Sequence, residues 1–221
     1  MTTLFYRLQL RAPTLIALFI GILLPFYIFS ILASEVAEHE VFAFDQPLLM
    51  FFHAHANTQL DSVMLFFTHI GSAPWVVPFE LALFAWLVYK RLRMDALFAF
   101  LSLTGAAALN VLAKNFFARS RPDFWISLQP ETTFSFPSGH SMNAMALAAL
   151  LIILGWKSKA RWLITAISAC FVLMVSVSRL YLGVHYPSDV MAAWAAALTW
   201  VVGLALILKW RHTATATRPG E

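Results

Sequence analysis

The chain has 221 residues, of which 61% are hydrophobic and only 12% are charged. Because an ordinary soluble domain carries about 25% charged residues, this composition excludes that class and indicates a protein that lies mostly in lipid. The formal net charge of +4 does not predict nucleic-acid binding, since the basic residues fall between apolar segments and form no basic soluble face.

Six runs with few or no charged residues approach the roughly 20 apolar residues that a helix needs to cross a membrane. In chain order they are 14–33, 73–89, 96–113, 138–156, 162–177 and 190–208. The first follows Arg7 and Arg11, as in a signal peptide, but it is long for one, so we expect an uncleaved anchor. The pattern predicts an all-α, polytopic membrane protein with about six transmembrane helices in one bundle. A single membrane-embedded domain would cover residues 1–221, with a short polar tail at 212–221.

The connection at 34–72 is the longest between these runs and is partly apolar, which predicts short helices lying in the membrane interface. It contains four histidines, but we expect no metal site in it. His53 and His55 are two residues apart and would point to different faces of a helix, and no cysteine or adjacent carboxylate completes a ligand set. The histidines are His39, His53, His55 and His69.

Lysine and arginine indicate orientation, because they accumulate in short cytoplasmic loops. When alternate connections are counted, 11 of the 15 basic residues fall on one side, which predicts that both termini are cytoplasmic. The four exceptions form an outward-facing group that runs against the topology rule and therefore indicates function. They are Lys114, Arg119, Arg121 and Arg179.

Three outward stretches, 114–122, 137–140 and 178–189, combine these cations with two histidines and a helix start. The alternation of spans places all three on the same side of the membrane. Phosphoryl transfer requires cations around the non-bridging oxygens, a nucleophile in line with the leaving oxygen, and an acid for the leaving group. A lone basic residue or histidine near a helix end usually has no such role, but snorkelling to the headgroups does not explain the whole set.

Three cations are candidates for binding the phosphate oxygens. Lys114 and Arg121 are seven residues apart, so a helix would place them on nearly one face, although Pro122 should end that helix near Arg121. Arg179 adds a planar guanidinium group whose paired N–H donors are suited to the oxygens of a phosphate. Ser138 is a good N-cap and Gly139 permits close backbone approach, so the helix that follows should aim free N–H groups at an anion.

Two histidines are candidates for the chemistry. His185 is followed four residues later by Asp189, and a carboxylate in the first turn of the next helix would bind one ring nitrogen and leave the other free to attack phosphorus. His140 is then the candidate acid that protonates the leaving group. This scheme needs no metal and no cofactor.

The three stretches read K-x6-R-P, P-S-G-H and S-R-x5-H-x3-D, and this pattern resembles the signature of the type-2 phosphatidic acid phosphatase superfamily at every fixed position. The resemblance implies that His185, aided by Asp189, forms a phosphohistidine, that His140 is the general acid, and that no divalent metal takes part. It assigns phosphate binding to Lys114, Arg121, Ser138, Gly139 and Arg179.

The six-span layout resembles the bacterial membrane branch, and the stretches 44–49, which includes Asp45, and 60–64 resemble the outer connection of relatives that act on undecaprenyl pyrophosphate, phosphatidylglycerol phosphate or phosphatidate. We therefore expect a lipid phosphatase of the bacterial inner membrane whose active site faces outward. Undecaprenyl pyrophosphate is the first choice of substrate, and Arg119 is a candidate for holding its second phosphate. The alternatives are a lipid phosphotransferase that uses the same site and a transporter, for which Glu80 within an apolar run is the best support. The sequence predicts no nucleic-acid partner and leaves the oligomeric state open.

Overall fold

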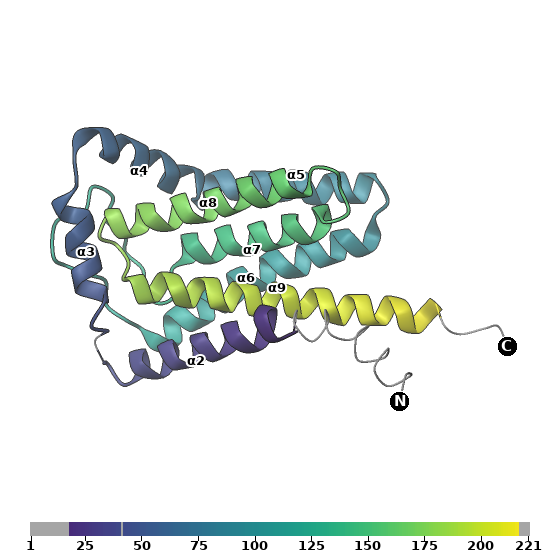
Figure 1. Ribbon diagram of the computed structural model, residues 1–221, viewed down its shortest axis with the longest axis horizontal. Helices are drawn as coiled ribbons and strands as arrows, with labels where there is room; N and C mark the ends of the chain where they lie inside the picture. The colour runs from purple at the N-terminus through teal and green to yellow at the C-terminus, as the bar shows by residue number, and fades with distance from the viewer. Residues whose placement is uncertain (1–17, 41, 217–221) are drawn as a thin grey trace, which may run out of the picture.

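The computed structural model describes residues 18–40 and 42–216, with side chains described as far as Leu208. All regular elements in this part of the chain are helical, as the apolar runs predict (Figure 1). In chain order they are η1 (Phe19–Leu23), α2 (Leu24–Ala37), α3 (Asp45–Ala54), α4 (Thr58–Ile70), α5 (Ala73–Tyr89), α6 (Arg93–Phe117), α7 (Gly139–Gly155), α8 (Arg161–Tyr181) and α9 (Pro187–Ala216).

Each of the six expected runs coincides with a helix, and the all-α, multi-pass architecture is confirmed. Four helices are long and apolar enough to span a membrane, and the bent pair α4–α5 adds a fifth if its 43° bend lies within one span. Helix α7 has only 17 residues, about 25 Å at 1.5 Å per residue, which is slightly less than the hydrocarbon thickness of about 30 Å. The count of six spans therefore stays a prediction.

Both ends of the chain differ from the expected layout or lie beyond it. Helix α9 continues to Ala216, so the expected polar tail from residue 212 begins as helix. Residues 14–17 of the first expected span lie outside the described residues, as do Arg7, Arg11 and the end of the tail at 217–221.

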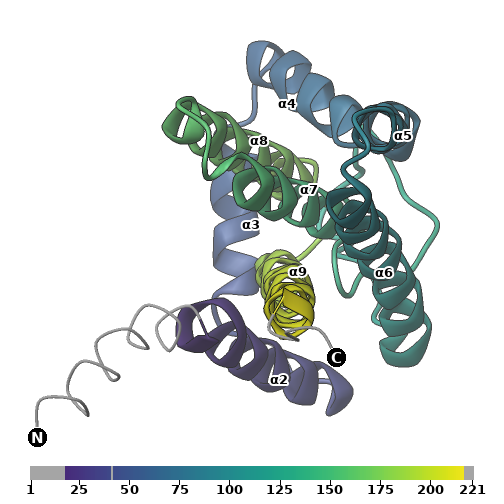
Figure 2. The same cartoon turned by 90° about the vertical axis from the view of Figure 1, so that its right-hand side faces the viewer.

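Helix α7 lies at the centre of the bundle, packed against α6, α8 and α9 (Figure 2). The contact faces are rich in small side chains: Ala146 and Ala149 on α7 meet Ala193 and Ala197 on α9 in the largest buried cluster. Small residues allow helices to approach closely in lipid, where association depends on packing more than on the hydrophobic effect. Helix α2 packs mainly on α9, to one side of the bundle.

One end of the bundle gathers all three motif stretches. Helices α2, α6 and α8 end there and α7 and α9 begin there, while α3 lies across this end, as expected for an interfacial helix (Figure 1). Helix α4 instead packs along α8 and leads into α5. The α5–α6 and α7–α8 connections lie at the opposite end and carry the basic residues Lys90, Arg91, Arg93, Lys157, Lys159 and Arg161.

The expectation that a helix continues to Arg121 is wrong. Helix α6 stops at Phe117, because Ala118 adopts the left-handed conformation (φ 46°) and its N–H closes the last turn on the Lys114 carbonyl. Arg121 therefore lies in the long loop 118–138, which folds over the end of the bundle. Residues of this loop line a cavity together with Gly139 and His140 at the start of α7.

Candidate active site

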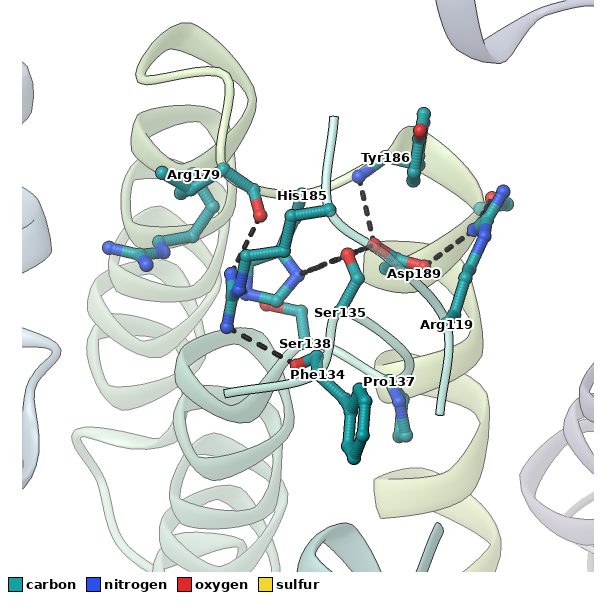
Figure 3. A network of polar contacts seen from close by, with 12 residues as sticks. Arg119, Phe134, Ser135, Pro137, Ser138, Arg179, His185, Tyr186 and Asp189 are labelled. Carbon is teal, nitrogen blue, oxygen red and sulfur yellow. Dashed lines mark hydrogen bonds and ion pairs between the residues drawn. The ribbon is translucent and has the colours of Figure 1, made fainter. Parts of the chain in front are cut away.

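His185 and Asp189 lie buried beside the start of α9, 1% and 0% exposed. Nδ1 of His185 is 3.3 Å from Oδ2 of Asp189. The same carboxylate oxygen accepts the Tyr186 backbone N–H at 2.9 Å and the Ser135 hydroxyl (Figure 3). The arrangement follows from local sequence, since Gly183, at φ +67°, makes the turn after α8, and Pro187 starts α9 and so places the Asp189 carboxylate in its first turn.

The other ring nitrogen of His185 faces a cation. Arg121 donates from Nη1 to Nε2 of His185 at 3.0 Å. A guanidinium can only donate, so Nε2 must accept, and the ring proton lies on Nδ1 toward Asp189. Burial lowers the pKa of His185 to about 3, against the opposing effect of Asp189. The imidazole is therefore neutral at pH 7, with its lone pair on Nε2.

A cavity of about 240 Å³ is lined by His185 and by Arg121, the partner of Nε2, but not by Asp189, the partner of Nδ1. Its wall brings together five of the eight expected site residues from three separate stretches of chain: Lys114, Arg121, Gly139, His140 and His185. Nε2 of His140 is buried without a hydrogen-bond partner among the described residues. An unpartnered imidazole nitrogen in the cavity wall suits a group that exchanges a proton with a bound molecule.

The loop 118–138 holds both cations of the first motif against the cavity. The Lys114 ammonium donates to the Phe134 carbonyl. Arg121 donates to the carbonyls of Thr133 at 2.6 Å and Val184 at 2.7 Å. Backbone carbonyls thus orient both side chains without neutralising them, and their charges stay available to an anion.

Ser138 is the N-cap residue of α7, as expected, but its hydroxyl makes no capping bond. It donates instead to Ser141 at 3.1 Å, away from the cavity. Gly139 lines the cavity, and a Cβ at this position would lie 3.2 Å from Oδ1 of Asn110. The start of α7 therefore offers the cavity backbone N–H groups and close approach, while the Ser138 hydroxyl serves helix packing.

Arg179 is fully buried, and its guanidinium group is paired with an acidic residue. It donates to the hydroxyl of Thr68 on α4 and forms an ion pair with Glu131, while its Nε has no partner among the described residues. Glu131 also lines the cavity. A carboxylate thus sits where sequence reasoning expects a phosphate oxygen, and the sequence analysis did not identify Glu131.

Arg119 does not have the expected position for a second phosphate. It does not line the cavity, and its guanidinium donates to Asp189 at 2.6 Å and to Asp45 of α3 at 3.0 Å. Sequence reasoning singled out Arg119 by its charge against the topology rule. It noted Asp45 only as part of the outer connection and gave it no role, and it did not identify Ser135.

Two of the outer histidines make local contacts. His53 stacks on Trp125 with ring centroids 4.3 Å apart, and His55 bonds to the Phe51 carbonyl through Nδ1 at 2.8 Å. Within residues 18–40 and 42–216, no three His, Cys, Asp or Glu side chains come together in a group that would hold a metal ion.

The sequence and the fold both match known proteins. The family described as the PAP2 superfamily matches residues 95–213. Phosphatidylglycerophosphatase B of Bacillus subtilis is 31% identical over 178 residues, which cover 78% of this chain and 87% of that protein. Undecaprenyl-diphosphatase of Sulfolobus acidocaldarius is 29% identical over 178 residues, which cover 78% and 82%.

Two crystal structures superpose on this chain. The transmembrane PAP2 type phosphatidylglycerolphosphate phosphatase from Bacillus subtilis has a TM-score of 0.74 at 28% identity and covers 87% of this chain and 96% of its own. Aquifex aeolicus LpxE shares the fold, with a TM-score of 0.63 at 23% identity over 75% of this chain and 96% of its own. With the three motif stretches gathered around one cavity, these matches show that the chain is a multi-pass membrane protein and belongs to the PAP2 superfamily of phosphatases.

Proposed function

We propose that this protein hydrolyses lipid phosphates or pyrophosphates through a phosphohistidine on His185, without a metal ion. The observation that carries the proposal is the placement of His185 Nε2 at a cavity wall shared with Lys114, Arg121 and His140. Nucleophile, cations and a second histidine converge there from segments far apart in sequence, as phosphoryl transfer requires.

In the first step, Lys114, Arg121 and the N–H groups at the start of α7 bind the non-bridging oxygens. The Arg121 guanidinium then donates to the phosphate in place of Nε2 of His185, and Nε2 attacks phosphorus. The negative charge of the bound phosphate favours the imidazolium form of His140, which donates its proton to the lipid oxygen as the bond from phosphorus to that oxygen breaks, and so becomes neutral. Asp189 stabilises the positive charge that develops on the His185 ring.

In the second step, His140, now without its proton, takes a proton from water as the water oxygen attacks phosphorus. The bond from phosphorus to Nε2 breaks, which releases inorganic phosphate and restores both histidines to their starting states. His140 thus acts as acid and then as base, as microscopic reversibility requires. A lipid or sugar hydroxyl in place of water would make the same site a phosphotransferase.

An apolar groove supports a lipid substrate. It has a volume of about 630 Å³ and is lined by side chains of α2, α6 and α9 together with Pro137 and Met142. It lies next to the polar cavity, because Asn110 lines that cavity and donates to the Pro137 carbonyl at 3.1 Å. One hydrocarbon chain can lie in this groove while the headgroup reaches His185.

The names of the relatives bring both substrate classes into the proposal, since phosphatidylglycerophosphatase B and undecaprenyl-diphosphatase match similar shares of this chain. We keep undecaprenyl pyrophosphate as first choice and phosphatidylglycerol phosphate and phosphatidate as the alternatives. Because Arg119 is engaged by two carboxylates, recognition of a second phosphate would fall to other groups at the cavity.

We also propose that the protein lies in a bacterial inner membrane with the site facing outward and both termini cytoplasmic. The basic α5–α6 and α7–α8 connections at the end opposite the site support this orientation.

Cysteine labelling tests this orientation. In a Cys170→Ser background, Ile126→Cys at an exposed loop position should react with a membrane-impermeant maleimide in intact cells. Lys159→Cys should react only after permeabilisation, and the reverse pattern would overturn the orientation.

The central experiment measures phosphate release from the three lipids by purified protein in detergent with excess chelator. Wild type, His185→Ala and the matched control His55→Ala are compared, because His55 is exposed and remote from the cavity. We expect release by wild type and control and none by His185→Ala. Equal release by all three would refute the histidine mechanism, dependence on a metal would refute the metal-free scheme, and phosphate found only on an added acceptor would identify a phosphotransferase.

A further inference from the structure

A chain of ionic contacts connects the surface helix α3 to the back of the candidate nucleophile. Arg119 donates to Oδ1 of Asp189 at 2.6 Å and to Oδ2 of Asp45 at 3.0 Å. The other oxygen of the Asp189 carboxylate faces His185. The order of groups is therefore carboxylate, guanidinium, carboxylate and imidazole, with alternating charge from Asp45 to Asp189.

Asp45 also acts on the helix that carries Asp189. Its Oδ1 accepts the Ser188 backbone N–H at 2.9 Å and its Oδ2 accepts the Ser188 hydroxyl at 2.6 Å. Ser188 is in the first turn of α9, where N–H groups have no partner within the helix. A carboxylate from α3 thus caps α9 from outside, at the end where the helix dipole favours negative charge.

Burial and stacking restrict these groups to one arrangement. Asp45 is 1% exposed, and the Arg119 side chain is only 13% exposed. The Arg119 guanidinium carbon lies 4.1 Å from the centre of the Tyr186 ring, which adjoins His185 in sequence. A side chain buried this deeply stays ionised only where groups of opposite charge or hydrogen-bond donors stabilise it. The charged state of each carboxylate therefore depends on Arg119.

We propose that Asp45 and Arg119 are positioning residues for the reaction: they fix the Asp189 carboxylate, and through it the His185 ring, in the orientation that points Nε2 at phosphorus. Neither residue lines the cavity, so neither touches the substrate phosphate. The docking of α3 on the bundle is thereby part of what makes the nucleophile competent. The proposal rests on the proposed histidine mechanism.

The test separates the chemical step from phosphate binding. Asp45→Asn and Arg119→Gln are purified in detergent and assayed for kcat, for KM with phosphatidate, and for the inhibition constant of inorganic phosphate. We expect kcat to fall about 10- to 100-fold in each variant, the range for losing a hydrogen bond to a charged group. KM and the phosphate inhibition constant should stay within about twofold, because Lys114 and Arg121 are untouched.

Asp61→Asn is the matched control. Asp61 lies on the neighbouring helix α4 and accepts the Tyr181 hydroxyl at 2.6 Å, so the same chemical change weakens a comparable inter-helix contact without reaching Asp189. We expect activity within about twofold of wild type. Equal kcat losses in Asp61→Asn and Asp45→Asn would show that any loosened outer helix has this effect and would overturn the specific role of Asp45.

The double variant Asp45→Asn/Arg119→Gln tests whether the two residues act as one unit. Its kcat should fall less than the product of the two single losses, because each residue acts through Asp189. Multiplicative losses, an unchanged kcat in both single variants, or equal weakening of kcat and phosphate binding would overturn the proposal. A wild type that is inactive toward all three lipids would instead refute the proposed function, which distinguishes the two failures.

Discussion

Nε2 of His185 accepts a hydrogen bond from Nη1 of Arg121 at 3.0 Å, while Nδ1 of the same ring faces Asp189 at 3.3 Å. The lone pair of the proposed nucleophile is thus hydrogen-bonded to Arg121, the cation that we propose binds phosphate. A phosphate that enters the cavity offers that cation a charged acceptor in place of a neutral nitrogen, so binding of the substrate frees the nucleophile. In the proposed mechanism, substrate binding is therefore coupled to exposure of the attacking atom.

The pH dependence should reflect the buried environment of His185. Burial lowers its pKa to about 3, so the ring stays neutral as pH falls through 6.5, the ordinary value, and Nε2 can still attack at pH 5.5. Asp189→Asn removes the group that raises this pKa, which moves the pKa further down. We expect kcat/KM to fall about 100- to 10,000-fold through loss of the correct tautomer and of charge stabilisation.

The loss caused by Asp189→Asn should therefore be the same at pH 5.5 and pH 8. Measuring the ratio of wild type to variant at each pH cancels the titration of the substrate phosphate itself. A ratio that grows toward pH 8 would show that wild-type His185 is protonated near neutral pH, contrary to its burial.

Glu131 should compete with phosphate for Arg179. Its carboxylate is paired with the buried guanidinium and lines the cavity. Glu131→Gln keeps the size and a hydrogen-bond acceptor but removes the negative charge. We expect inorganic phosphate to inhibit this variant at concentrations about three- to tenfold lower than for wild type, because repulsion between the carboxylate and the phosphate is lost.

A matched change for Glu131→Gln is Glu35→Gln, on the exposed side of α2 and outside the cavity lining. It should leave the phosphate inhibition constant unchanged. Weaker phosphate binding in Glu131→Gln would mean that the carboxylate orients Arg179 and does not compete with the ligand.

Gly183 should be required for the turn that presents His185. Its φ of +67° is costly for other residues, and a Cβ there would lie 2.5 Å from the ring of Trp125. Gly183→Ala should destabilise the protein by about 1–3 kcal/mol, from backbone strain together with displacement of Trp125. It should also lower kcat, because His185 follows two residues later.

Gly203→Ala provides the comparison for Gly183→Ala. A Cβ at Gly203 would have its nearest neighbour, Ile22, at 3.9 Å, which is ordinary van der Waals contact. Thermal unfolding in detergent should show a lower midpoint for Gly183→Ala and an unchanged or slightly higher one for Gly203→Ala. Equal midpoints in the two variants would show that the Gly183 turn tolerates a side chain.

Filling the apolar groove should affect long-chain lipids selectively. Gly203 lines the groove on α9, so Gly203→Phe should lower kcat/KM for long-chain phosphatidate by about tenfold, as expected when chain contacts worth about 1–3 kcal/mol are lost. Hydrolysis of dioctanoyl phosphatidate, whose chains are short, should change little and thus reports that the site is intact. Equal losses for both substrates would show that the groove does not bind the lipid chain.

Local patterns in the sequence were sufficient for the helices and most of the site. A helix that crosses lipid must be apolar along its whole length, so each span is visible as an uncharged run, and α5 begins and ends where the run 73–89 does. His185, Asp189, Lys114 and His140 were identified because each stands at a fixed spacing within a short stretch. The alternation of spans alone then places those stretches at one end of the bundle.

The tertiary structure decided which charges face one another. Ala118 ends α6 early by adopting a left-handed conformation that no local pattern announces, and so Arg121 reaches His185 from a loop. Arg119 lies 74 residues from Asp45 in the chain, and Arg179 lies 48 from Glu131. Ion pairs between residues so far apart in the chain form only when the helices pack together. The spacing of charged residues in the sequence does not indicate which of them will pair. The sequence by itself therefore determined the membrane fold and the candidate reacting groups, and only packing determined how those groups are held.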